Sequence, residues 1–145
     1  MTCIVATLEA MAADRFVTYG PSYTGDTKIW TAKGSIWGAA GETSCILAFK
    51  AWTLGKRKRP QIEKEEDDST RIEVLQLSPK GLYLWINDSA GDAIKEHFYA
   101  IGSGGGYAIG ALSMGASLEQ AIEVAAKWDS NTRLPFDMLK LKRKR

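Results

Sequence analysis

The segment 72–87 places two apolar runs on either side of a short turn. "IEVLQL" at 72–77 and "LYLWIN" at 82–87 are rich in residues that favour β-strands. The intervening "SPKG" puts Pro79 and Gly81 in turn positions. Strands joined by so short a connection pair antiparallel, since a parallel pair needs a long crossover. The segment therefore predicts a β-hairpin, and the fold must contain an antiparallel sheet.

Groups of strands alternate with helices in the rest of the chain. In the first half, we expect strands at 3–8 and 15–19 around an "AMAAD" turn, a second pair at 27–31 and 34–39, and a helix from Glu42 to Leu54 that ends at Gly55. In the second half, we expect a strand at 97–101, a helix over 105–115, a helix that begins at Ser117, and a strand over 135–141.

Each of the two longer helices has an apolar face. In the first helix this face consists of Cys45, Ala48, Phe49 and Trp52. In the last helix it consists of Leu118, Ala121, Ile122, Ala125 and Trp128. Ser117 and Gln120 have the spacing of a capping box, which fixes the start of the last helix.

The order of these elements predicts the fold class. Runs of strands separated by helices are typical of an α+β fold rather than an alternating parallel one. Two packed sheets with helices outside them would satisfy this order. The chain has 145 residues without an internal repeat, which suits a single domain over 1–145 with one charged loop and a basic tail.

The charge distribution argues against several function classes. The net charge is +2, and five basic residues fall within the tail at 140–145, so the body of the chain is slightly acidic. The tail lacks interleaved aromatic residues, and nucleic-acid binding is therefore not indicated. No apolar run approaches the length of a membrane span, and no basic region precedes the first apolar residues. We expect a cytoplasmic protein without a membrane partner.

The cysteines and the single histidine define no metal or cofactor site. Cys3 and Cys45 lack the spacing of a disulfide framework or a metal motif, and both fit buried thiols in a reducing compartment. A cysteine enzyme that pairs either thiol with His97 is a weak hypothesis, because nothing in the sequence brings them together. No cofactor and no metal ion are expected.

The segment 56–71, "KRKRPQIEKEEDDSTR", interrupts the regular pattern. A basic block, a proline and an acidic block follow one another. A solvated, mobile loop is the preferred interpretation. Its opposed charges could instead form a docking surface for a neighbouring subunit.

The stretch 99–108, "YAIGSGGGYA", is the most informative for function. Gly102 and Gly104 begin a dinucleotide-binding pattern, but Tyr107 stands where its third glycine is required. A dinucleotide site is therefore rejected. A tight turn from a strand to a helix remains, in which Ser103 presents a hydroxyl group.

Five stretches in order resemble the proteasome β-type subunits, and in particular the bacterial HslV-type peptidases. They are "TCIVA" at the start, "MAADR", "TKIW", "GAAGETS" and "YAIGSGGGYAIGAL". In this resemblance "MAADR" matches the second strand of the family, which carries an acidic residue after small ones. The resemblance implies the four-layer αββα sandwich of the N-terminal-nucleophile hydrolases.

The resemblance also assigns a nucleophile and its neighbours. Thr2, once Met1 is removed, matches the nucleophile, and its own α-amine acts as the base. Lys28 matches the lysine beside the threonine hydroxyl, and Asp14 matches the acid that holds this lysine. The connection between Thr2 and Asp14 is shorter than the usual hairpin of the family.

Three further residues match the rest of the family's site. Gly41 matches the glycine whose backbone N–H serves the oxyanion hole. Ser103 and Asp129 match the polar pair that orients the amine. After Asp129, "SNTRLP" lacks a glycine often present in proteasome subunits, and the segment 56–71 replaces a second long helix.

The resemblance implies a threonine peptidase that cleaves unfolded polypeptides inside a homo-oligomeric ring, with an ATP-dependent unfoldase as its partner. Two alternatives stay open. The chain could be an inactive structural or assembly subunit, which retention of Met1 would indicate, or an amide hydrolase of the same fold acting on a small molecule.

Overall fold

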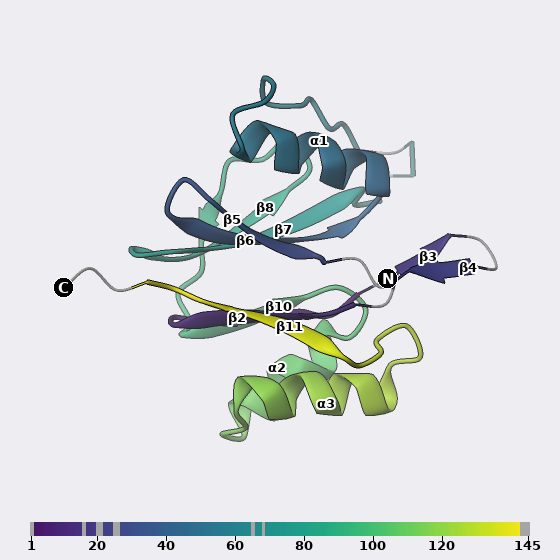
Figure 1. The fold of residues 1–145 in the computed structure, drawn as a ribbon, viewed down its shortest axis with the longest axis vertical. Helices are drawn as coiled ribbons and strands as arrows, with labels where there is room; N and C mark the ends of the chain where they lie inside the picture. The colour runs from purple at the N-terminus through teal and green to yellow at the C-terminus, as the bar shows by residue number, and fades with distance from the viewer. Residues whose placement is uncertain are drawn as a thin grey trace.

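Two β-sheets pack face to face and carry helices on their outer sides, which gives four layers (Figure 1). The computed structural model describes residues 2–15, 17–19, 22–24, 27–64, 66–67 and 69–142. The α+β, αββα sandwich expected from the sequence is thus the observed architecture. Of the basic tail, residues 143–145 lie outside the described residues, and Lys140 is the last residue of a strand.

The first sheet has four antiparallel strands and lies against two helices. Its strands, in spatial order, are β10 (Phe98–Ile101), β1 (Ile4–Thr7), β2 (Ala10–Asp14) and β11 (Phe136–Lys140). The helices that cover it are α2 (Gly105–Ser113) and α3 (Leu118–Trp128). The capping box predicted at Ser117 is confirmed, because its hydroxyl accepts from the Gln120 N–H and the Gln120 side chain accepts from the Ser117 N–H.

The second sheet has five antiparallel strands and carries one helix. Its strands, in spatial order, are β5 (Ile29–Ala32), β6 (Ser35–Gly41), β7 (Ile72–Ser78), β8 (Gly81–Ile86) and β9 (Asp92–Ala93). The hairpin predicted at 72–87 is confirmed as β7–β8. Helix α1 (Thr43–Thr53) covers the outer face. None of the helices in the described part of the chain combines the length and apolar character needed to cross a membrane.

The strand assignment from the pattern at the N-terminus is wrong in one place. "AMAAD" is not a turn but strand β2, whose five residues are all buried. Residues 17–19 belong instead to β3 (Val17–Tyr19), which pairs with β4 (Ser22–Thr24) in a separate two-stranded sheet. Alanine has a low intrinsic preference for strands, but β2 is covered on both faces, and small side chains allow the close approach of α3. The resemblance gave the correct element here.

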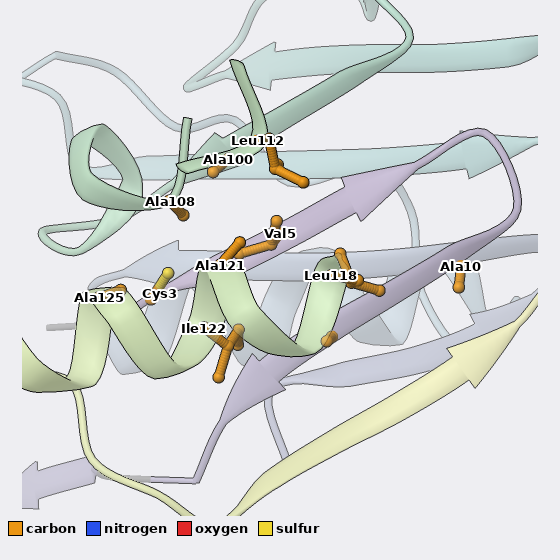
Figure 2. Close-up of a cluster of buried hydrophobic side chains, with 11 residues drawn as sticks. Cys3, Val5, Ala10, Ala100, Ala108, Leu112, Leu118, Ala121, Ile122 and Ala125 are labelled. Carbon is orange, nitrogen blue, oxygen red and sulfur yellow. The ribbon is translucent and has the colours of Figure 1, made fainter. Parts of the chain in front are cut away.

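Three apolar clusters fill the spaces between the layers. The cluster between the first sheet and its helices includes Val5, Ala121 and Ile122, each fully buried (Figure 2). A second lies between the sheets and a third under α1. The apolar face predicted for α3 is confirmed except at Trp128, the last residue of the helix, which is 63% exposed.

The charged segment after α1 carries no helix or strand in its described residues, yet part of it is anchored. Ile62 is 3% exposed, and its N–H donates to the Asp88 carboxylate. The Arg59 guanidinium lies 5.5 Å from the Trp52 ring centre and 5.4 Å from that of Trp85. The interpretation as a solvated, mobile loop is therefore wrong for this part, because Ile62 packs in the cluster beneath α1 and the Arg59 guanidinium lies against two of its rings.

Replacing Ile62 with alanine should lower the free energy of unfolding by about 2–4 kcal/mol, since a buried isoleucine loses most of its apolar contacts. Urea unfolding followed by circular dichroism measures this loss. Leu47→Ala on α1 is the matched control, because Leu47 is 61% exposed and should change the stability by less than about 0.5 kcal/mol. Equal effects of the two substitutions would contradict the anchored segment.

Candidate active site

A buried ion pair lies beside the start of the chain. The Lys28 ammonium is 2.9 Å from Asp14 Oδ1, with Lys28 9% exposed and Asp14 fully buried. Asp14 ends β2, and the β1–β2 hairpin sets it opposite Cys3, whose N–H donates to Asp14 Oδ1 at 3.0 Å. Lys28 comes directly before β5 of the second sheet. The packing of the two sheets thus brings the two side chains together, and the short first hairpin still reaches this geometry.

The environment of Lys28 changes its proton affinity. Burial lowers the pKa of Lys28 below its ordinary value, and the adjacent Asp14 carboxylate opposes this shift only in part. A buried charge pair is stable only while both partners are present, because removal of one leaves the other desolvated. The Arg133 N–H adds a third donor to Asp14, at 3.2 Å from Oδ2. The ammonium is therefore held in one position next to Thr2.

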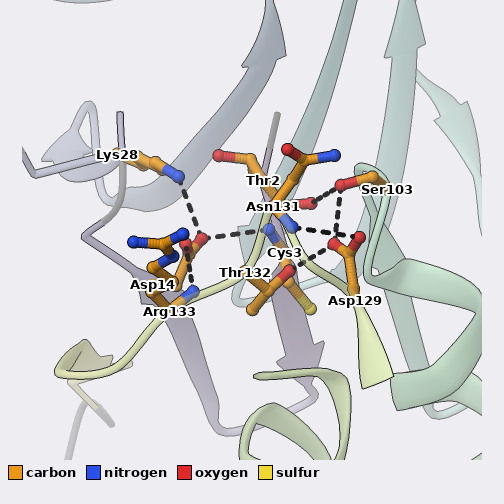
Figure 3. Close-up of polar contacts among 9 residues, drawn as sticks. All are labelled: Thr2, Cys3, Asp14, Lys28, Ser103, Asp129, Asn131, Thr132 and Arg133. Atoms are coloured by element: carbon orange, nitrogen blue, oxygen red, sulfur yellow. Dashed lines mark hydrogen bonds and ion pairs between the residues drawn. The ribbon is translucent and has the colours of Figure 1, made fainter. Parts of the chain in front are cut away.

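A second polar group lies on the other side of Thr2 (Figure 3). Ser103 Oγ donates to Asp129 Oδ2 at 2.7 Å, and Thr132 Oγ1 donates to the same oxygen at 2.6 Å. Burial alone would raise the pKa of Asp129, but the hydrogen bonds from Thr132, Ser103 and the Asn131 N–H outweigh it and keep this pKa below its ordinary value. Asp129 is thus held in its charged form, and its oxygens can only accept hydrogen bonds.

Sequence analysis missed two members of these groups. Thr132, 1% exposed, donates a hydrogen bond to Asp129, and the backbone N–H of Arg133 donates one to Asp14. Both lie in the loop after α3 that was noted only for lacking a glycine. The spacing of Asp129 and Thr132, three residues apart after a helix, is typical of local side-chain hydrogen bonding and could have indicated the first contact.

The turn between β10 and α2 fixes the backbone of Thr2. The Thr2 carbonyl accepts from the Gly104 N–H at 3.2 Å, and Ser103 Oγ, whose hydrogen is donated to Asp129, lies 3.5 Å from the same carbonyl oxygen. Gly102 has a φ of +88°, and a Cβ atom there would overlap the Thr2 carbonyl oxygen. Glycine is therefore required at 102 both for its backbone conformation and for this close approach.

Gly41 lies across a cavity from this turn. The cavity has a volume of about 500 Å³ and is lined by Thr2, Gly41, Ser103 and the chain at 69–73. Gly41 ends β6 two residues before α1, and a Cβ atom on it would overlap the Arg71 carbonyl oxygen. The close packing of β6 against residue 71 is thus sufficient to explain glycine here. Its proposed part in an oxyanion hole stays a prediction.

The structure brings together all six residues selected from the sequence. Lys28 and Asp14 form one group, Ser103 and Asp129 another, and Thr2 lies between them, while Gly41 shares the cavity with Thr2. Their individual roles stay predictions. No three His, Cys, Asp or Glu side chains within the described ranges are grouped as metal ligands.

The cysteine alternative has no support in this geometry. Cys3 is fully buried, and its burial, together with the nearby Asp14 and Asp129, raises the pKa of its thiol to about 12. Burial also raises the pKa of Cys45. A thiol with such a pKa forms almost no thiolate at neutral pH. His97 is exposed on the segment before β10.

The αββα layers and the site between the two sheets define a protein with the fold of the N-terminal-nucleophile hydrolases, of the proteasome type. The chain is similar over 99% of its length to 99% of BPH from Thiobacillus denitrificans, with a TM-score of 0.73 and 19% identity. It is similar over 98% of its length to 99% of eukaryotic HslV from Trypanosoma brucei, with a TM-score of 0.70 and 17% identity.

A third solved structure shares the fold with a longer chain. Anbu, an ancestral β-subunit from Yersinia bercovieri, has a TM-score of 0.68 and 10% identity, over 96% of this chain and 81% of Anbu. No protein-family model matches the sequence, and the search of curated proteins found no match. The likeness to HslV-type proteins expected from the sequence is therefore confirmed in the fold, which is what identities of this size establish.

Proposed function

We propose that the chain is a threonine peptidase subunit that cleaves peptide bonds of unfolded polypeptides, with Thr2 as nucleophile once Met1 is removed. Met1 itself lies outside the described residues. The observation that carries the proposal is the position of Thr2 at the wall of a cavity, between the Lys28–Asp14 ion pair and the hydrogen-bonded Ser103–Asp129 pair. An isolated threonine hydroxyl is a weak nucleophile, and it needs a base and fixed charges close by.

The chemistry would proceed in two steps. The Thr2 hydroxyl attacks the peptide carbonyl carbon, and its proton passes to the free α-amine of Thr2, whose ordinary pKa is about 8. The Lys28 cation favours the neutral amine and the developing alkoxide. The Gly41 N–H donates to the oxyanion, a contribution of about 3 kcal/mol in such sites. The C–N bond breaks, the proton goes to the leaving amine, and water then hydrolyses the Thr2 ester.

The proposal also includes an oligomeric assembly and a partner protein. A homo-oligomeric ring would enclose Thr2 and restrict it to unfolded chains, and an ATP-dependent unfoldase would supply them. The buried, unpaired thiols of Cys3 and Cys45 are compatible with a reducing cytoplasm.

The intact mass of the protein, before and after incubation with a peptide epoxyketone, tests the proposal. BPH of Thiobacillus denitrificans has been solved in complex with epoxomicin, which makes this reagent the natural probe. We expect a species lighter by one methionine that gains the mass of the inhibitor. A full-length mass without adduct would contradict the peptidase and favour an inactive scaffold subunit, to which the absence of a helix in the described part of 56–71 lends support.

Gly102→Ala should lower the rate of peptide cleavage by about a hundredfold, because a Cβ atom there displaces the Thr2 carbonyl and shifts the nucleophile. A fluorogenic peptide measures the rate. Gly106→Ala on α2 is the matched control, since a Cβ atom at 106 meets nothing within 4 Å. It should keep full activity, and a hundredfold loss there too would contradict this explanation.

A further inference from the structure

The cavity beside Thr2 is large enough to hold a side chain of a bound polypeptide. Its volume of about 500 Å³ falls within the range of about 300–1,000 Å³ that is common for ligand pockets. Because Thr2 itself lines the cavity, a side chain that fills it belongs to a residue directly beside the bond that Thr2 would attack.

Glu73 points into this cavity. Along β7, Ile72 and Val74 pack in the cluster under α1, whereas Leu75 lies in the cluster between the two sheets. Side chains alternate along a strand, so Glu73 shares the face of Leu75. Its direct partner on β6 is Ala40, which also belongs to the cluster between the sheets. The Glu73 side chain therefore faces the space between the sheets, at the end where Thr2 lies.

Among the charged groups that the structure describes around the cavity, one carboxylate forms no ion pair. Glu42 and Arg71 neutralise each other, because the Arg71 guanidinium donates twice to Glu42 Oε2, at 2.8 and 3.1 Å. Lys28, the cation next to Thr2, is bound to Asp14. Among the residues that the structure describes, Glu73 forms no ion pair. The opposite wall, from Gly102 and Ser103, carries no charge.

The wall that holds these charges is fixed in place. The buried Asn87 side chain accepts from the Arg71 N–H at 2.9 Å and from the Ile72 N–H at 3.1 Å. These bonds anchor the backbone at the start of β7, from which the Glu73 side chain projects, so that the strand does not have to move to meet a bound chain.

We propose that Glu73 makes this cavity a subsite for a lysine or arginine side chain next to the bond that is cleaved. This inference rests on the proposed peptidase and names its substrate class. A cation in the cavity forms a charge-assisted hydrogen bond with Glu73, whereas an acidic side chain is placed beside a like charge.

The test measures binding to the full-length Thr2→Ala protein, which should hold a peptide without cleaving it. The fluorescently labelled peptides form sets of three that are identical except at one position, where they carry lysine, norleucine or glutamate. Each position of the peptide is varied in turn. At one position the lysine peptide should bind at least about tenfold more tightly than the glutamate peptide, the size expected for a hydrogen bond to a charged group.

Two further variants assign this preference to Glu73. Adding Glu73→Gln should reduce the ratio to near one, and adding Glu73→Lys should favour the glutamate peptide. Glu123→Gln, an equal change of charge on the exposed side of α3, should leave the ratio unchanged. Equal affinities in the Thr2→Ala protein, no binding by any peptide, or a preference that survives Glu73→Gln would overturn the inference.

The binding test separates this inference from the peptidase proposal. It requires neither removal of Met1 nor a competent nucleophile. A lysine preference without epoxyketone labelling of the wild-type protein would contradict the catalytic proposal alone. Labelling without a lysine preference would contradict the subsite alone.

Discussion

Thr2→Ala should abolish peptide cleavage, lowering the rate at least about a thousandfold, and should leave the fold intact. The side chain would supply the attacking oxygen, for which no other residue at the site can substitute in the same position. The fold should tolerate the change because the hydrogen bond that Thr2 accepts from the Gly104 N–H uses its backbone carbonyl. Hydrolysis of a fluorogenic peptide and a thermal melt measure the two effects.

Thr2→Ser is the matched control for this substitution. Serine keeps both the hydroxyl group and the α-amine, and it is also small enough for Met1 to be removed. We expect measurable cleavage and an epoxyketone adduct from Thr2→Ser, and neither from Thr2→Ala. Cleavage by Thr2→Ala at the wild-type rate would exclude Thr2 as the nucleophile.

Lys28→Met should abolish cleavage and also lower the free energy of unfolding by about 3–5 kcal/mol. Methionine fills most of the volume of lysine but leaves the fully buried Asp14 carboxylate without its cation. The Cys3 and Arg133 N–H groups remain as donors to Asp14 and keep the loss from being larger. Urea unfolding and the fluorogenic assay give the two quantities.

Two comparisons isolate the effect of the buried pair. Adding Asp14→Asn to Lys28→Met removes the stranded charge and should restore part of the stability without restoring activity. Arg15→Met breaks the more exposed ion pair with Asp137 and should cost much less stability than Lys28→Met. If Lys28→Met cleaves like wild type, Lys28 has no part in the chemistry.

Local signals in the sequence were sufficient for several elements. Pro79 and Gly81 predicted the β7–β8 hairpin, and Ser117 with Gln120 predicted the start of α3. In each case the residues act through contacts with their near neighbours in the chain, which a single sequence displays directly.

Elements that depend on distant packing were not predictable in the same way. The pattern at 10–14 indicated a turn, yet these residues form β2, which pairs with β1 near the N-terminus and with β11 near the C-terminus. Likewise, the sequence next to Ile62 does not indicate that this residue packs against the aromatic rings of α1 and β8 or that its N–H donates to Asp88. Such contacts join residues far apart in sequence, so their cause lies outside any local window.

The candidate site was predictable through the family resemblance rather than through local chemistry. No spacing rule connects Thr2 with Ser103 or Asp14 with Lys28. The first two residues meet because β1 pairs with β10, and the last two meet only after the two sheets have packed. The loop after α3 shows the limit of the resemblance. There the sequence departs from the family pattern, and the contribution of Thr132 emerged only from its contact with Asp129.

The tryptophans are distributed unequally, so that their fluorescence reports mainly on one side of the molecule. Trp30, Trp37, Trp52 and Trp85 all lie in or against the cluster beneath α1, and the fifth tryptophan, Trp128, lies exposed at the end of α3. Tryptophan emission from a Trp128→Phe protein would therefore come from the α1 side alone. Its change during unfolding, compared with the circular dichroism of the whole chain, would reveal whether that side loosens before the sheet that carries Thr2, without any added dye.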